Sequence, residues 1–427
     1  MKSKIIRTII NHVFLLVGGA LLGLLLLLLV YCLPTAPIKE HVYLSLPMLE
    51  REFETENLLE EFPATFMGGF TDCLMLQNAI YESEEHSTLE QVLRMYRGES
   101  GTGEGWAPGY SLIDYLEGTK QPREEAYSRY WHGYLVVLRP MLFLTTFTSL
   151  RVLAAWVQLV LVGAVLLACS GQKETFLGWA FLLSVPFLYY FCLYTSLSLS
   201  ICFYVLTVAL IVQLKADTAL RRRGWYGYFF LLVGMAAAYF DFLTYPLVTL
   251  GFPLCVYLYL GREDWKRTFR GLAAGSLEWG LGYLGLWSLK WVIADLFTGS
   301  STVKDGVATL LERTGRAEEQ SVISGFLSVV GQNMSVYGNW GFYLLILGIL
   351  FWLGYQILRN RNRITGDGVK SAGILLLVAL YPFVWFFFTQ NHSMEHWVYT
   401  YKILSVTVFA GICAVGRMFC REEDHGE

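Results

Sequence analysis

The sequence predicts an all-α polytopic membrane protein with about ten transmembrane helices and a large first extracytoplasmic loop that contains short and interfacial helices. The first observation is composition: the 427 residues are 55% hydrophobic and 16% aromatic, with a mean hydropathy of +0.46, which is too apolar for a set of soluble domains. The second is that the apolar residues form segments of membrane-spanning length, with the basic clusters between them on one side.

Charge and cysteine content exclude two further classes. The net charge is only −3, so no global positive field points to a nucleic-acid partner. The eight cysteines are scattered and form neither a disulfide framework nor a CxxC motif. The sequence therefore gives no metal site built from cysteine.

The first apolar segment, Ile9–Leu33, follows Lys2, Lys4 and Arg7. About 25 residues are enough to cross a hydrocarbon core about 30 Å thick. A cleaved signal peptide is the alternative, but its apolar core is usually only about 7–15 residues long, and VYCLPTAP is a weak cleavage site. We therefore expect residues 1–35 to form a retained helix with its N-terminus in the cytoplasm.

Residues 36–140 are predicted to form the extracytoplasmic loop, because glutamates far outnumber lysines and arginines in most of it. Pro47–Glu61 and Ser87–Arg97 have helical periodicity, and Gly98–Gly109 has the composition of a turn or ligand loop. Tyr127–Pro140 mixes aromatic and basic residues, as an interfacial helix does.

Residues 141–427 are predicted to form a bundle of about nine helices, with a second external loop at 298–337. With the N-terminus inside, every basic cluster falls in the cytoplasm, which predicts that both termini are cytoplasmic. No inverted repeat of the transporter kind is visible. The predicted spans are Thr148–Cys169, Phe176–Tyr194, Ser198–Leu214, Gly227–Tyr239, Tyr245–Leu260, Leu272–Phe297, Gly338–Leu358, Ser371–Phe388 and Tyr401–Val415.

Two aspartates at the predicted outer face are candidate catalytic groups. Asp72 lies in GGFTDCLMLQNAIY, where it can cap a helix over Cys73–Tyr81 or act as a general base, and the two roles are compatible. Asp241 lies in YFDFLTYP between two spans, among aromatic residues. An acid near lipid usually faces a cavity or a partner, and a turn cap is the alternative role.

Basic and aromatic residues of the same face form a candidate phosphate site. Lys290 is about five residues from the outer end of its span, so it either snorkels to the interface or faces an anionic ligand. Glu278 of that span is about 18 Å away along the helix axis and cannot pair with it. TQNHSMEHWVYTYK supplies His392, His396 and neighbouring donors suited to a phosphate, whereas a metal site lacks the H-E-x-x-H order.

In layout the chain resembles the polytopic C-type glycosyltransferase superfamily, whose enzymes use polyprenyl-phosphate sugars, and no closer subfamily is identified. The resemblance rests on the N-terminal span, on Asp72 in TDCLML, on YSRYWHGYLVVLRP before the second span, and on the late NHSMEHWVYTYK. It covers nearly the whole chain. The family often has a paired acidic motif, whereas Cys73 follows Asp72 here, which weakens any metal-dependent assignment.

The resemblance implies an inverting transfer of a sugar from a polyprenyl-phosphate donor to a glycan, lipid or protein acceptor, in the cell envelope outside a bacterial plasma membrane. It implies Asp72 as the base and Asp241 as a second carboxylate. No metal ligands and no certain cofactor are identified, and a divalent cation stays open. The implied phosphate-binding residues are Arg129, His132, Lys290, His392, His396, Tyr399 and Lys402.

Two other functions stay open at this stage. A transporter or flippase for a lipid-linked or anionic solute would use the intramembrane charges as its pathway, but it is disfavoured by the missing repeats and the large loop. A polysaccharide polymerase or ligase would also use a polyprenyl-linked donor, but its large loop is expected late in the chain.

Overall fold

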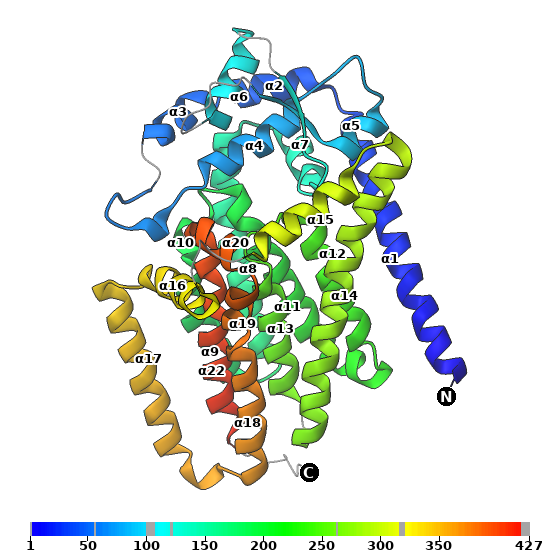
Figure 1. Ribbon diagram of the computed structural model, residues 1–427. Coiled ribbons are helices and arrows are strands. Elements are labelled where there is room, and N and C mark those ends of the chain that lie inside the picture. Colours follow the sequence, from blue (N-terminus) through cyan, green and yellow to red (C-terminus); the bar gives the residue numbers. More distant parts are fainter. Residues whose placement is uncertain are drawn as a thin grey trace.

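The computed structural model describes residues 2–54, 57–99, 107–119, 123–261, 264–315 and 321–419. Their secondary structure is almost entirely helical, so the all-α class is confirmed (Figure 1). Six helices of these residues are long and apolar enough to span a membrane: Ile6–Tyr31, Phe147–Gly171, Leu197–Arg223, Trp340–Arg359, Gly366–Phe388 and Trp397–Arg417.

The predicted count of ten spans is too high by this measure. Several other predicted spans fall on shorter apolar helices of 10–17 residues, among them Thr175–Leu188, Tyr226–Phe240 and Leu247–Leu260. The span predicted at Leu272–Phe297 lies in a helix of 34 residues, Trp265–Thr298, which is long enough but is not among the six.

A layer of short elements, here called the head layer, covers one end of a helical bundle (Figure 1). It comprises α2 (Thr35–Tyr43), α3 (Leu46–Glu54), η1 (Pro63–Thr65), α4 (Gly69–Ile80), α5 (Thr88–Arg94), β1 (Tyr96–Glu99), α6 (Ala107–Glu117), β2 (Arg123–Ala126) and α7 (Leu135–Leu144).

The bundle helices run between the head layer and the opposite end, where α1 begins and α22 ends (Figure 1). They are α1 (Lys2–Tyr31), α8 (Phe147–Gly171), α9 (Thr175–Ser184) with η2 (Val185–Leu188) and α10 (Tyr190–Leu193), α11 (Leu197–Arg223), α12 (Tyr226–Phe240), α13 (Leu247–Leu260), α14 (Trp265–Thr298), α17 (Trp340–Arg359) with η3 (Arg361–Arg363), α18 (Gly366–Ala379), α19 (Tyr381–Phe388) and α22 (Ser405–Arg417).

Five further short helices lie at the head-layer end of the bundle. The predicted external loop 298–337 contains α15 (Thr302–Arg313) and α16 (Val322–Ser335). The connection between α19 and α22 contains α20 (Gln390–Glu395), α21 (Trp397–Thr400) and η4 (Tyr401–Leu404).

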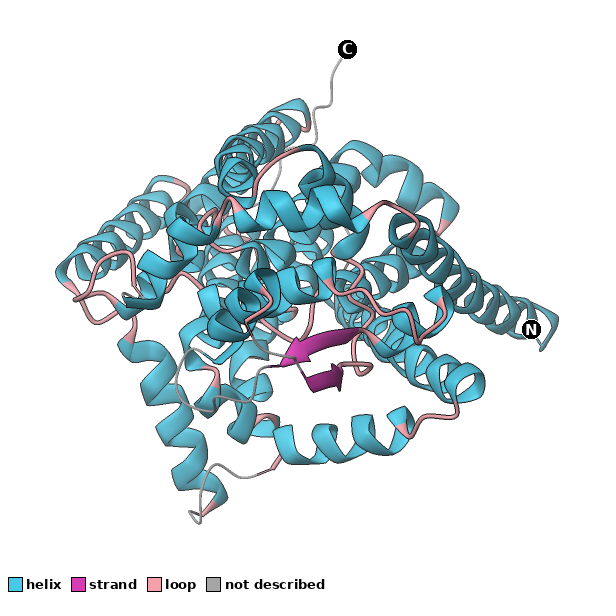
Figure 2. Cartoon of the chain, turned by 90° about the horizontal axis from the view of Figure 1, so that it is seen from above, coloured by secondary structure: helices cyan, strands magenta, loops and turns pink. Residues whose placement is uncertain are grey.

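The head layer differs from the predicted elements in three places. The helix predicted at Pro47–Glu61 ends at Glu54, and the interfacial helix predicted at Tyr127–Pro140 begins only at Leu135. The helix predicted at Ser87–Arg97 ends at Arg94, because Met95 has a left-handed φ of 51° and the chain continues as a strand. This strand, β1, pairs antiparallel with β2, from Tyr96 opposite Ala126 to Glu99 opposite Arg123 (Figure 2). Most of the turn predicted at Gly98–Gly109 lies outside the described residues.

Buried cations attach the head layer to the bundle through the carbonyl ends of helices. Arg139 of α7 is 1% exposed and donates from Nε to Val30 O (3.0 Å) and from Nη2 to Leu33 O (3.3 Å), at the end of α1, and also to Ala79 O, at the end of α4. The last carbonyls of a helix lack partners and carry the negative end of its dipole. One guanidinium therefore binds two helix ends together.

Helix α1 packs on the bundle through one ion pair and a close approach. His12 Nε2 lies 2.7 Å from Glu278 Oε2 of α14, which gives Glu278 the partner that the sequence alone did not identify. The Tyr239 hydroxyl donates to Gly23 O (2.7 Å), and a Cβ at Gly23 would lie only 2.5 Å from the Tyr239 ring. The glycine therefore lets α1 approach α12 closely.

Candidate functional site

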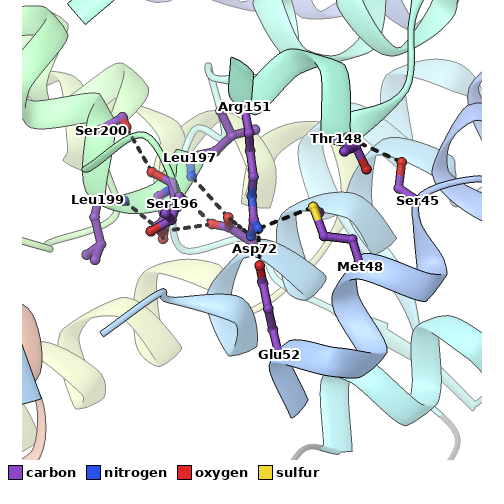
Figure 3. A network of polar contacts seen from close by, with 12 residues as sticks. Ser45, Met48, Glu52, Asp72, Thr148, Arg151, Ser196, Leu197, Leu199 and Ser200 are labelled. Carbon is purple, nitrogen blue, oxygen red and sulfur yellow. Dashed lines mark hydrogen bonds and ion pairs between the residues drawn. The ribbon is translucent and has the colours of Figure 1, made fainter. Parts of the chain in front are cut away.

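The sequence offered two roles for Asp72, and one of them, the cap of its own helix, is wrong. Helix α4 begins at Gly69, after Gly68 in the left-handed conformation (φ 65°), so Asp72 lies within the first turn. Its carboxylate instead accepts hydrogen bonds from the backbone nitrogens of Leu197 and Ser198, each at 3.0 Å, at the start of α11 (Figure 3). A carboxylate from the head layer thus caps a helix of the bundle.

The surroundings of Asp72 are those of a structural contact. Its side chain is fully buried, and Ser196 Oγ (3.2 Å) and Arg151 Nη2 (3.5 Å) also bind it, while Arg151 pairs with Glu52 (Figure 3). Burial raises the pKa of Asp72, and Arg151 and the two backbone donors oppose that rise. With several donors already bound and no exposed surface, the carboxylate holds the head layer on the bundle.

Lys290 and Lys402 have contacts similar to those of Arg139. Lys290 Nζ donates to Val92 O (3.1 Å) and Leu93 O (2.8 Å), at the end of α5, and is fully buried. Lys402 Nζ donates to Leu188 O (2.9 Å), at the end of η2, and to the Tyr401 hydroxyl (2.7 Å). Lys290 thus joins α14 to the head layer and Lys402 joins η4 to η2, and both side chains are away from solvent.

Three of the other predicted site residues, His392, His396 and Tyr399, do come together, around a residue that the sequence analysis had not selected. Arg313, the last residue of α15, donates from Nη1 to His392 Nδ1 of α20. The His392 ring lies 4.8 Å from the His396 ring, which stacks on Tyr399 at 5.3 Å. We call Arg313, His392, His396 and Tyr399, together with Asp241, the outer cluster.

The two histidines of the outer cluster are neutral. Burial lowers the pKa of His396 to about 4, and burial, His396 and Arg313 together lower the pKa of His392 well below its usual range. Because Arg313 donates to Nδ1 of His392, the proton of the neutral ring is on Nε2, which donates to Leu243 O (3.0 Å). The positive charge of the cluster therefore comes from Arg313.

Asp241 follows the last residue of α12 and holds the turn to α13. Its Oδ2 accepts from the backbone nitrogen of Thr244 (2.9 Å) and its Oδ1 accepts from the Thr244 hydroxyl. Asp241 therefore caps the turn, which is the alternative role that the sequence offered for it. Leu243, in the same turn, has a left-handed φ of 68°, and strained backbone of this kind is often found at functional sites.

Asp241 is only 2% exposed, so it is buried like Asp72, but its neighbours are different. Burial raises the pKa of Asp241 to about 6, so the group loses its proton near neutral pH. Asp241 and Arg313 both lie within electrostatic range of the hydroxyl groups of Tyr130 and Tyr399. Besides Thr244, the Cys202 side chain and the Leu243 backbone act on this carboxyl group as hydrogen-bond donors, and all of them oppose the rise of its pKa. Asp241 therefore has the protonation behaviour of a general base.

The segment before α7 adds Arg129 and a third neutral histidine, His132, and Arg97 of β1 lies beside it. The Tyr127 ring lies between the guanidinium groups of Arg97 (4.9 Å) and Arg129 (5.2 Å). Arg129 also pairs with Asp305 at 3.1 Å. His132 bonds to the Tyr134 hydroxyl (2.9 Å) and Tyr127 O (2.8 Å), and burial lowers its pKa to about 3. His132 therefore fixes this segment and carries no positive charge.

An apolar groove of about 590 Å³ lies beside the bundle under α16. Its walls include Ile346 and Leu350 of α17 and Val408 and Ile412 of α22, and its outer end includes Tyr337 and Leu404. Helix α17 stands apart from α18 and α22 on this side (Figure 1). The same α16 reaches the chain of the outer cluster, because Asn333 donates to Ser393 O (3.1 Å) and accepts from Thr400 Oγ1 (2.8 Å).

Within the described ranges, no group of three or more His, Cys, Asp or Glu side chains could hold a metal ion. Comparisons with protein-family models, with curated proteins and with solved structures give no match.

Proposed function

We propose that this protein is an inverting membrane glycosyltransferase that transfers a sugar from a polyprenyl-phosphate donor to an acceptor hydroxyl at the head-layer end of the bundle. The observation that carries the proposal is that His392 joins Arg313 to the turn of Asp241: it accepts from the guanidinium of Arg313 and donates to Leu243 O, two residues after a carboxyl group with a pKa of about 6. Asp241 can accept a proton, and Arg313 can bind a phosphate. Asp72 keeps a structural role in this proposal.

The proposed reaction is a single displacement. Asp241 accepts the proton of the acceptor hydroxyl as its oxygen forms a bond to the anomeric carbon. The bond from that carbon to the phosphate oxygen breaks, and the electron pair leaves on the polyprenyl phosphate. Arg313 stabilises the charge on the leaving phosphate, and the neutral His396 and Tyr399 can donate hydrogen bonds to it. Attack from the side opposite the leaving group inverts the anomeric configuration.

The polyprenyl chain is proposed to lie in the apolar groove between α17 and α22. The groove has walls of Ile, Leu and Val side chains, and its outer end lies at α16, next to the helices that carry the cluster. A long isoprenoid can thus stay in an apolar environment while its phosphate reaches the polar end of the bundle. Arg313 is the residue that the phosphate meets there.

The proposal also includes the topology. All ten predicted segments would cross the membrane, including those that contain the shorter helices α9, α12 and α13. The head layer and the segment before α7 contact the start of α11, the end of α12 and the last third of α14. Successive helices of the bundle would therefore run in opposite directions. The basic connections after α8, α11, α13 and α17 would then face the cytoplasm of a bacterial cell.

Replacing Arg313 by glutamine is expected to raise the donor KM by roughly ten- to hundredfold, because a charge-assisted hydrogen bond of about 1.5–3 kcal/mol is lost. The measurement is sugar transfer from polyprenyl-phosphate donors by purified protein in detergent, with donor concentration varied. Arg359→Gln, an exposed arginine at the opposite end of the bundle, is the matched control and should leave KM unchanged.

An unchanged donor KM in Arg313→Gln would remove this residue from the phosphate site. The transport alternative has a different readout: a flippase would move a labelled lipid across proteoliposomes without forming a glycosidic product. Movement without transfer over a panel of donors would therefore contradict the enzyme assignment.

A further inference from the structure

A second cavity lies at the end of the bundle opposite the outer cluster. It has a volume of about 270 Å³ and lies among the last turn of α11, the first turns of α12, and α13 and α14. Glycines form much of its wall, at positions 224, 227, 271 and 275. Ligand pockets usually measure about 300–1,000 Å³, so this cavity suits a small polar group or a lipid headgroup.

Side chains of opposite charge line this cavity. Arg221 is held by Asp217, which accepts from Nε at 3.0 Å, and by Tyr257 O, which accepts from Nη2 at 2.7 Å. The guanidinium also lies over the rings of Tyr226 (5.2 Å) and Tyr257 (4.7 Å). These contacts fix its plane, and Nη1 is the guanidinium nitrogen that has no hydrogen-bond acceptor among the described residues.

Glu278 of α14 supplies the negative charge. Its Oε2 is bound to His12, while Oε1 lies against the cavity wall, 3.2 Å from where a Cβ of residue 227 would be. Any side chain at Gly227 would therefore crowd this oxygen. The cavity thus offers one hydrogen-bond donor with positive charge and one acceptor with negative charge to the same ligand.

The surroundings of the cavity are those of a membrane surface. Two exposed tryptophans belong to the segments that line it: Trp225, between the lining residues Gly224 and Tyr226, and Trp265, at the start of α14, are 45% and 40% exposed, and Trp is enriched at the boundary between lipid and water. Exposed basic residues precede the lining glycines 224 and 271 in the sequence: Arg222, Arg223, Lys266, Arg267 and Arg270. Such a basic rim attracts phosphate groups of the adjoining leaflet.

We propose that this cavity binds the phosphoethanolamine headgroup of a phospholipid. The phosphate accepts from Arg221 Nη1 and the ammonium donates to Glu278 Oε1, so both charges of the headgroup are paired. A glycerol headgroup has no ammonium for Glu278, and a choline headgroup has no N–H to donate. The site therefore discriminates by the amine, and it is independent of the reaction at the outer cluster.

The test is lipid binding by the full chain, measured by native mass spectrometry after exchange with vesicles of phosphatidylethanolamine, phosphatidylglycerol or phosphatidylcholine. We expect phosphatidylethanolamine to be retained over the other two by about tenfold, and this preference to fall below about threefold in Glu278→Gln. Ala274→Trp, which fills the exposed mouth but keeps both charges, should abolish retention of the lipid.

His12→Gln removes the ion pair but leaves the cavity, so it separates loss of the site from loosening of α1, and it should keep the preference. Arg223→Gln tests for non-specific surface charge and should also keep it. Equal retention of the three lipids, or an unchanged preference in both Glu278→Gln and Ala274→Trp, would overturn the proposal. Stabilisation by soluble glycerophosphoethanolamine without lipid preference would overturn the lipid source.

Discussion

Replacing Asp241 by asparagine is expected to reduce sugar transfer by roughly 10²–10⁴-fold while the melting temperature stays nearly unchanged. The amide has the shape of the carboxylate and can still accept from the Thr244 backbone nitrogen, so the turn before α13 keeps its cap. It cannot take a proton from an acceptor hydroxyl, so the contribution of general-base catalysis is lost. The measurement is the initial rate of transfer by purified wild type and variant, beside their melting curves.

Asp295→Asn is the matched control, because Asp295 also caps a chain segment, accepting from Thr302 N (2.6 Å) and Val303 N (3.1 Å), without the outer cluster as a neighbour. Its activity should be retained. The pH dependence gives a second readout: a base must be deprotonated, so wild-type kcat/KM should rise with pH through about 6, where Asp241 loses its proton. Equal activity of wild type and Asp241→Asn would exclude Asp241 as the base.

Replacing Asp72 by alanine is expected to lower the free energy of unfolding by about 3–5 kcal/mol. The change leaves the first backbone nitrogens of α11 without their cap and removes one of the two carboxylates beside the buried Arg151. Asp72→Asn should be destabilised less, since it keeps one acceptor oxygen. The measurement is the thermal or denaturant unfolding of the purified variants in one detergent.

Asp367→Ala provides the control for Asp72→Ala, because Asp367 is an exposed acid in the first turn of α18 whose partner Lys370 lies 3.9 Å away. Its stability should change by less than about 1 kcal/mol. A normal melting temperature with lost transfer in Asp72→Asn would reverse the assignment and make Asp72 the base. Lowered stability, with transfer retained by the folded fraction, is the result expected of a structural carboxylate.

The sequence was informative about the class of fold because apolar segments and their basic flanks are local features. It was less informative about the head layer, where the β1–β2 pair depends on contacts between residues about thirty positions apart. Helix periodicity continued past Arg94 in the sequence, but the left-handed conformation of Met95 ends the helix there. Short elements of this kind are selected by tertiary contacts that a periodic pattern does not contain.

The sequence predicted which end of the helices carries the candidate site, but it did not predict which residues contact one another there. Asp241, His392, His396 and Tyr399 were selected as polar residues at the ends of apolar segments, and the structure brings them together. Arg313 was missed because it lies in the predicted external loop, among other charged residues, where the sequence does not show which of them meets the late connection. One feature of the sequence could have identified it: Arg313 directly precedes Thr314 and Gly315, so it lies at a helix end on the predicted outer face.

The buried charges show why a charged residue in an apolar chain is ambiguous in the sequence. Lys290 and Lys402 were interpreted as phosphate ligands, but in the structure their partners are backbone carbonyls, which leave no mark in an amino-acid sequence. Arg139 binds carbonyls in the same way. A three-dimensional structure is needed to distinguish an ammonium group that binds helix carbonyls from one that is free to bind a ligand.

The most direct test of the account is a cryo-EM structure of the protein with a polyprenyl-phosphate sugar bound. We expect the phosphate within hydrogen-bond distance of Arg313, the sugar beside Asp241, and the first isoprene units in the groove between α17 and α22. A phosphate bound beside Lys290 or Asp72, with the head layer moved to admit it, would contradict the account.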